Sequence, residues 1–226
     1  MLDFDISPFD ISKKNLSEAI VYSNHNDYWK NTPHEGMNLL TIDQSGKVGE
    51  RTFHDWCRSC ADIRIDYDDK NTNQPDGVYE GSISLASEPQ INVNVTNPKY
   101  LILTERVVRN KFRYENKTAR IGKHGQFQHE NVKPKEFCDL IVFLDYTPHE
   151  IYLTIMSSDF DLNEKHPIFG VKPHIRKDSI SGYKFDLGAT AIAKGIEAGI
   201  TMRVDDRTPR EHVHNFIKKF LIWWPI

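Results

Sequence analysis

The sequence predicts an α/β (α+β) fold, in which a β-sheet is flanked by helices, and three observations support this class. Residues 43–57 carry an apolar stripe at helical spacing, made by Val48, Phe53, Trp56 and Cys57. Several other runs alternate apolar and polar residues or are continuously apolar, as expected of strands. With 226 residues, 38% hydrophobic and 27% charged, the chain has the size and composition of one ordinary globular domain.

The elements of the first half follow from local patterns. Residues 17–22 are compatible with a helix, and Asp43 or Ser45 is a candidate cap of the helix over 43–57. A strand is expected over 61–67, then a loop over 68–75, and a further strand that begins after Pro75-Asp76. Two more strand-like runs, 90–95 and 99–104, precede a strand over 111–122 that is rich in aromatic and β-branched residues.

The second half begins with a predicted hairpin. The runs 138–145 and 151–156 read as two apolar strands, joined by a turn over 147–150. Residues 159–182 read as loops, and 186–198 read as a helix. A last helix is expected from Thr208 as cap, with Pro209 in its first position and Glu211 completing a capping box.

Charge is unevenly distributed along the chain. The net charge is −3, but residues 1–90 hold eight Lys/Arg against sixteen Asp/Glu, whereas residues 105–135 hold nine Lys/Arg against three Asp/Glu. A local basic segment is enough for contacts to phosphate, whatever the net charge of the chain. A solvated basic loop is the other interpretation of this segment.

The cysteine content and the hydropathy of the chain indicate the cellular compartment in which the protein is expected. Three cysteines cannot all pair, which favours a reducing, cytoplasmic setting. Cys57 and Cys60 lack the second Cys or His pair of a structural zinc site. No apolar run is long enough to span a bilayer, so no membrane partner is expected.

The chemistry is expected at Glu115 and Lys117. On a strand these two side chains share one face and Asn116 points to the other. A carboxylate can hold a hard cation, and an ammonium group beside it can stand next to an attacking water. Asp76, which opens the preceding strand, supplies a second carboxylate. An exposed ion pair on a solvated strand remains the alternative interpretation.

Proline, aspartate and then Glu-x-Lys resembles the signature of the PD-(D/E)xK nucleases, the superfamily that holds most type II restriction endonucleases. The segment Gln126-Phe127-Gln128 and the two apolar strands after it add to the likeness. The resemblance implies a single nuclease domain over 1–226. Its core of about 43–156 would have a mixed central sheet flanked by helices, an inserted β element at about 80–110, and C-terminal loops and helices over 157–226.

Two features depart from the family pattern. Thirty-eight residues separate Asp76 from Glu115, where the family has a modest connection. Asn116 stands where the family usually has an apolar residue that faces the core.

The resemblance also implies a mechanism. Asp76 and Glu115 would coordinate Mg²⁺ together with the backbone carbonyl of Asn116, and Lys117 would position the attacking water. The products would carry a 5′-phosphate and a 3′-hydroxyl. Glu50 matches a glutamate that the family often places on the helix before the sheet, where it supports the metal site directly or through a water. The alternative for Glu50 is an exposed glutamate favoured by the helix dipole.

Specificity for double-stranded DNA is expected from side chains that enter the grooves, while phosphate contacts fix the register. The candidates are Arg120, Lys123, His124, Gln126, Gln128, His129, Asn92 and Asn94. The resemblance further implies a homodimer on palindromic DNA, because protein symmetry mirrors site symmetry.

Two other functions stay open at this point. A repair or otherwise non-specific nuclease could use the same core without strict sequence specificity. A non-catalytic DNA-binding module would carry Glu115 and Lys117 as a surface pair and would bind DNA without metal.

Overall fold

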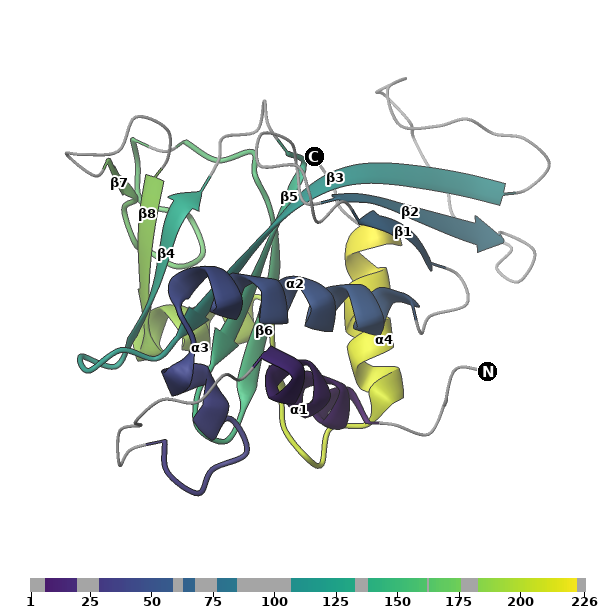
Figure 1. The fold of residues 1–226 in the computed structure, drawn as a ribbon. Helices are drawn as coiled ribbons and strands as arrows, with labels where there is room; N and C mark the ends of the chain where they lie inside the picture. Colours follow the sequence, from purple (N-terminus) through teal and green to yellow (C-terminus); the bar gives the residue numbers. More distant parts are fainter. Residues whose placement is uncertain are drawn as a thin grey trace.

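The computed structural model describes residues 7–19, 29–58, 63–67, 77–84, 107–132, 138–161, 163–175 and 183–222. Its elements run in the order α1 (Pro8–Ala19), η1 (Glu35–Leu39), α2 (Ile42–Arg58), β1 (Ile63–Tyr67), β2 (Gly77–Ser84), β3 (Val107–Arg120), β4 (Gln126–Val132), β5 (Leu140–Tyr146), β6 (Ile151–Ser157), β7 (His174–Ile175), β8 (Tyr183–Gly188), α3 (Ala189–Glu197), β9 (Thr201–Val204) and α4 (Arg210–Ile222). Figure 1 shows the arrangement.

The main sheet is mixed, as the sequence predicts. Six strands lie in the order β1-β2-β3-β5-β6-β9. Only the β3–β5 pair is parallel; the other described neighbours in this sheet are antiparallel. Helices flank the sheet: α1 packs on α2, and α2 packs on β3. The α/β class with a mixed sheet between helices is therefore confirmed.

Strand β3 is long and pairs with two neighbouring strands along different parts of its length. Its residues from Val107 to Tyr114 pair with β2, and those from Tyr114 to Arg120 pair with β5. Tyr114 is thus the residue at which β3 changes from one neighbour to the other. Glu115 is the first residue of β3 beyond the described β2 ladder.

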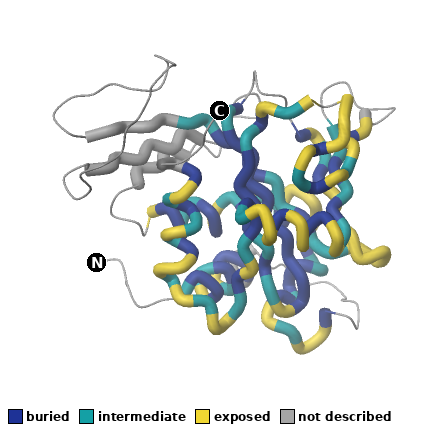
Figure 2. Tube along the Cα trace, turned by 180° about the vertical axis from the view of Figure 1, so that it is seen from behind, coloured by how far each residue is buried: buried dark blue, intermediate teal, exposed yellow. Residues whose placement is uncertain are grey.

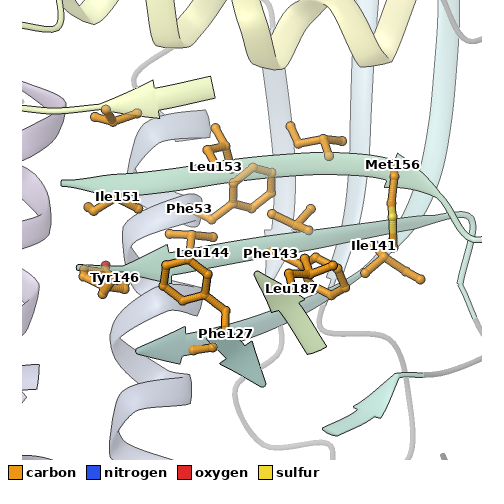
Figure 3. Close-up of a cluster of buried hydrophobic side chains, with 14 of the residues drawn as sticks. Phe53, Phe127, Ile141, Phe143, Leu144, Tyr146, Ile151, Leu153, Met156 and Leu187 are labelled. Carbon is orange, nitrogen blue, oxygen red and sulfur yellow. The ribbon is translucent and has the colours of Figure 1, made fainter. Parts of the chain in front are cut away.

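A second, three-stranded sheet has the order β4-β8-β7. Phe127, His129 and Val132 of β4 are buried, and so are Phe185 and Leu187 of β8, the strand that pairs with β4. Every residue of β5 is buried, because this strand has protein on both faces. Figure 3 shows Phe127 and Leu187 in the same core as residues of β5 and β6, and Figure 2 shows burial concentrated in the central strands.

Three details correct the sequence-based expectations. Helix α2 is capped by Thr41, not by Asp43 or Ser45: the Gln44 N–H donates to Thr41 Oγ1 (3.2 Å) and the Thr41 N–H donates to Gln44 Oε1 (2.9 Å), a capping box. Residues 183–188 form strand β8, so the helix predicted from 186 begins only at Ala189.

The third detail concerns α4, which begins at Arg210, one residue after Pro209. The Thr208 hydroxyl donates to Asp205 Oδ1 (2.9 Å) and accepts from the Asp205 N–H (2.9 Å). This hydroxyl therefore closes the turn before the helix, where the sequence predicted a helix cap.

Most of the other predicted elements are confirmed. The helix over 43–57 and the strands over 61–67, after Asp76, and over 111–122, 138–145 and 151–156 are found as α2, β1, β2, β3, β5 and β6, with ends that differ by a few residues. Of the helical stretch 17–22, residues 17–19 belong to α1 and the rest lie outside the described residues, and the loop predicted over 159–182 contains the short strand β7. The inserted strand-like runs 90–95 and 99–104 lie outside the described residues. Within the part of the chain that is described, no helix is both long and apolar enough to cross a membrane.

Candidate functional site

Glu115 and Lys117 lie on the same face of β3 and form an ion pair between Lys117 Nζ and Glu115 Oε1. The Glu115 side chain is 6% exposed and the Lys117 side chain 21% exposed. The pair is therefore sheltered, and the Lys117 side chain is its more accessible member. This is the arrangement that the sequence predicts for the two residues.

Helix α2 fixes which way the strand faces. The ring of Tyr114 meets the ring of Phe53 edge-on, with 5.5 Å between the ring centroids. Gly49 lies so close to Thr118 that a Cβ atom at position 49 would overlap the Thr118 hydroxyl. Tyr114 and Thr118 thus face α2, so Glu115 and Lys117 face away from it.

Asn116 lies on the helix-facing side. It is 4% exposed and its Oδ1 accepts a hydrogen bond from Thr118 Oγ1 (3.3 Å). The side chain therefore faces the core although it is polar, and its hydrogen bond offsets part of the cost of burying the amide.

Glu50 lies on α2, next to Gly49, and its Oε2 pairs with Lys47 Nζ at 2.6 Å on the same helix. Helix α2, which carries Glu50, covers one face of β3, whereas the Glu115 side chain lies on the opposite face. A role of Glu50 in metal binding stays a prediction.

The partner carboxylate predicted from sequence, Asp76, lies outside the described residues, as do Asn92 and Asn94. The strand that follows Asp76 is described: β2 begins at Gly77, and Gly77 pairs with Tyr114 in the antiparallel ladder. Glu115 follows Tyr114 on β3, and Asp76 precedes Gly77 in the sequence.

Further charged groups lie along the same stretch of β3. Arg113 donates from Nε to Asp139 Oδ2 (3.1 Å) and from Nη2 to Oδ1 (3.1 Å), which holds the guanidinium bidentately.

Burial, followed by the negative charges of Glu115 and Asp139, raises the pKa of the Cys138 thiol to about 12. Cys138 is therefore a neutral thiol at physiological pH and a poor nucleophile.

Among the described residues, no group of three or more His, Cys, Asp or Glu side chains is arranged to hold a metal ion. The oxygen donors described at the site are the Glu115 carboxylate and the Asn116 backbone carbonyl. Carboxylate and carbonyl oxygens are the ligands that Mg²⁺ takes in proteins. The donor chemistry fits magnesium, provided that Asp76 completes the set.

Four of the predicted DNA-contacting side chains are exposed. They lie on the β3–β4 turn and on the outward face of β4: Lys123, His124, Gln126 and Gln128. Arg120 is engaged within the protein, because its Nη1 donates to the carbonyl oxygens of Met37 (2.7 Å) and Leu40 (3.0 Å). Arg120 thereby ties the end of η1 to β3.

The expectation that His129 contacts DNA is at odds with its position. The His129 side chain has 0% exposure, lies between the two sheets and stacks on Phe143, with ring centroids 3.9 Å apart. A side chain without accessible surface does not reach a base. The alternation along β4 could have indicated this, because Phe127, two residues earlier, also points inward.

His129 instead meets a residue that the sequence did not single out. Its Nε2 lies 2.8 Å from Oδ1 of Asp145 on β5, whose side chain is also 0% exposed. The contact has the distance of an ion pair but lacks hydrogen-bond angles, and His129 Nδ1 and Asp145 Oδ2 have no hydrogen-bond partner among the described residues. Burial raises the pKa of Asp145, and the nearby His129 opposes this rise.

Comparison of the chain with protein-family models, with curated proteins and with solved structures gives no match.

Proposed function

We propose that this protein is a Mg²⁺-dependent endonuclease that hydrolyses phosphodiester bonds in double-stranded DNA, in the manner of a type II restriction enzyme. One observation carries the proposal. Glu115 follows Tyr114, the last residue of β3 in the described β2 ladder, and Lys117 pairs with Glu115 from the same face of the strand, two residues further along. To the carboxylate and the ammonium group of this pair the proposal adds the carboxylate of Asp76, which precedes Gly77 in the sequence.

The metal ligands in this proposal are the carboxylates of Asp76 and Glu115 and the backbone carbonyl of Asn116. When bound, Mg²⁺ supplies Lewis-acid stabilisation of the negative charge that builds up on the scissile phosphate. The low exposure of the Glu115 side chain, 6%, supports this role, because a sheltered carboxylate interacts more strongly with a cation than one in bulk water.

Lys117 holds and orients the attacking water. Its side chain is 21% exposed, and the ion pair keeps the ammonium group on the Glu115 face of β3. The water oxygen forms a bond to phosphorus while the bond from phosphorus to the 3′ oxygen breaks. The water loses a proton to solvent and the leaving 3′ oxygen gains one, which yields a 5′-phosphate and a 3′-hydroxyl without a covalent enzyme intermediate.

Sequence specificity in the proposal comes from the exposed polar residues of the β3–β4 turn and of β4. Gln126 and Gln128 lie on the outward face of β4 and carry amide groups, which can make paired hydrogen bonds to adenine in the major groove. A homodimer on palindromic DNA belongs to the same proposal, since a two-fold protein matches a two-fold site.

The test is incubation of the purified protein with phage DNA, once with Mg²⁺ and once with EDTA. Discrete fragments with Mg²⁺ alone are the expected result, and sequencing their ends gives the recognition site and the cut position. A smear would replace the proposal with a non-specific nuclease of the same site. DNA binding that is equal with and without metal, and without cleavage on several genomes, would favour a non-catalytic binding module.

A further inference from the structure

The link between Asp139 and Arg113 lies at the point where β3 changes partners. Residues of β3 up to Tyr114 pair with β2, and those from Tyr114 onward pair with β5. Arg113 precedes this change and Glu115 follows it, and both lie on one face of the strand because the face alternates with every residue. Asp139 immediately precedes β5. The link is therefore two residues from the proposed metal ligand Glu115, on the same face of β3.

Asp139 binds Arg113 through its side chain and its backbone. Its Oδ2 accepts from the Arg113 backbone N–H (2.8 Å) and from Nε (3.1 Å), and its Oδ1 accepts from Nη2 (3.1 Å). The Asp139 N–H in turn donates to the Arg113 carbonyl (2.9 Å). Charge-assisted, bidentate bonds of this kind are strong and fix geometry. The Arg113 side chain is 43% exposed and that of Asp139 41%, so the pair fixes geometry more than it stabilises the fold.

Asp139 is also anchored on its other side, at the end of β6. The Ser158 N–H donates to the Asp139 carbonyl (3.1 Å), and the Ser158 hydroxyl donates to the carbonyl of Cys138. Ser158 is itself buried, at 3% exposure. Hydrogen bonds thus run from Arg113 on β3 through Asp139 to the residue that follows β6. A carboxylate held in this way can fix the strand that it binds.

Glu115 lies where this anchoring matters. Beyond Tyr114, the described ladder of the main sheet holds β3 through β5, beginning with the pair Glu115 and Ile141. The Asp139 link joins β3 to β5 on the N-terminal side of Glu115, and the parallel ladder joins them on its C-terminal side. Reacting groups need this precision, because a displacement of about 1 Å can lower a rate by about 100-fold.

We propose that Asp139 is a positioning residue of the nuclease. Through Arg113 it fixes the part of β3 that carries Glu115, and so sets the position of the metal-binding carboxylate. Its effect on cleavage rests on the proposed nuclease function, whereas its effect on β3 does not require cleavage.

The test compares wild type with Asp139→Ala and with Asp139→Asn, which keeps an oxygen that can accept the Arg113 backbone N–H. Glu150→Ala is the matched control. Glu150, the residue before β6, pairs with Arg203 of β9, so this variant also removes the carboxylate partner of an exposed arginine, at the edge of the same sheet. Urea unfolding identifies the conditions under which all four proteins are folded.

Two quantities are measured under these conditions. Steady-state cleavage of DNA in Mg²⁺ gives kcat and KM. Hydrogen exchange of the backbone amides of Glu115, Asn116 and Lys117, followed by NMR in EDTA, reports on β3 without cleavage.

In Asp139→Ala we expect kcat to fall roughly 10- to 100-fold with KM unchanged, because Glu115 is misplaced while DNA binding is kept. The three amides should exchange about tenfold faster than in wild type, as expected for the loss of a hydrogen bond, while those of β6 keep their rates. Asp139→Asn should show smaller changes of both kinds, and Glu150→Ala should match wild type. Wild-type exchange in Asp139→Ala would overturn the proposal, as would equal losses of kcat in Asp139→Ala and Glu150→Ala.

The two measurements separate this proposal from the nuclease itself. If wild type cuts DNA and folded Asp139→Ala has the same kcat, the positioning role is wrong and the nuclease stands. If wild type never cuts, the nuclease is wrong. Faster exchange in Asp139→Ala would then still support the link to β3, and unchanged exchange would overturn it.

Discussion

His129 and Asp145 are two ionisable side chains with no exposed surface, pressed between the two sheets. Phe143 stacks on the His129 ring, and the ring centroid of Phe185 lies 6.2 Å from that of Phe143, so aromatic rings pack beside the pair. Charged groups in such a place cost several kcal/mol of solvation each, which their mutual attraction repays only in part. The pair therefore fixes the position of β4 relative to β5 but contributes little net stability.

If this is correct, the effects of substituting His129 and Asp145 on stability should be non-additive. Asp145→Ala leaves His129 buried without its partner and should lower the free energy of unfolding by about 3 to 5 kcal/mol. His129→Phe should do the same to Asp145. The free energy of unfolding of the double variant His129→Phe with Asp145→Val should be closer to that of wild type than that of either single variant. Neither position then holds an ionisable group without its partner. Urea denaturation measures all four proteins. Additive losses in the double variant would contradict this account.

Some contacts of individual residues can be predicted from the sequence and others cannot. The pairing of Glu115 with Lys117 on one strand face could be predicted, because it depends only on the period of a strand. The contacts of Arg120 with Met37 and Leu40, and of His129 with Asp145, join segments that are distant in sequence. No local pattern predicts them, so both residues resembled DNA contacts from sequence alone.

At the scale of elements, the position of the site depends on how closely α2 approaches β3. Gly49 permits this approach, because any Cβ at that position would overlap the Thr118 hydroxyl. Gly46, one turn earlier on the same helix, has nothing within 4 Å of a Cβ built on it. The two glycines thus form a natural pair for comparison.

Gly49→Ala should lower the free energy of unfolding by about 1 to 3 kcal/mol, because the helix must move away from the strand or the threonine must shift. Gly46→Ala should raise it by about 0.8 to 1.0 kcal/mol, because alanine is the better helix former and nothing obstructs it. Thermal or urea unfolding of both variants provides the comparison. Equal effects of the two substitutions would refute the close contact.

The elements that could be predicted have strong local signals. Helix α2 has its apolar stripe, and β5 and β6 are apolar runs bounded by turn residues. Strand β9 has four residues, Thr201–Val204, and gives no comparable signal. Strand β8 does alternate, with Phe185 and Leu187 inward, but its pattern joins directly to helix α3 at Ala189. Pairing with β4 decides that this stretch is a strand.

For the whole molecule, buried histidines couple stability to pH. His34 is 0% exposed; its Nδ1 donates to the Thr147 carbonyl (2.9 Å) and its Nε2 has no hydrogen-bond partner among the described residues. Burial lowers the pKa of His34 to about 4, with smaller effects of Lys13 and His149 in the same direction, opposed by the bond to Thr147. Burial likewise lowers the pKa of His166 to about 4.

A lowered histidine pKa means that the unfolded chain binds more protons than the folded protein between pH 6.5 and about 4. Stability should therefore fall as the pH falls through this range. For His34 the loss between pH 7.5 and pH 5 should be roughly 2 kcal/mol. The non-titrating variant His34→Asn isolates this effect: its deficit in unfolding free energy relative to wild type should shrink by that amount at pH 5. An unchanged deficit would exclude His34 as the source.

The most direct test of the central claim compares DNA cleavage by wild type, Glu115→Gln and Lys117→Met in Mg²⁺, because these substitutions remove charge and largely keep side-chain volume. Glu164→Gln and Lys165→Met, at exposed positions, are the matched controls. Wild type and the controls should give the same discrete fragments, and the two site variants should cut at least about 100-fold more slowly while remaining folded. Cleavage at the wild-type rate by a folded Lys117→Met or Glu115→Gln protein would contradict the account.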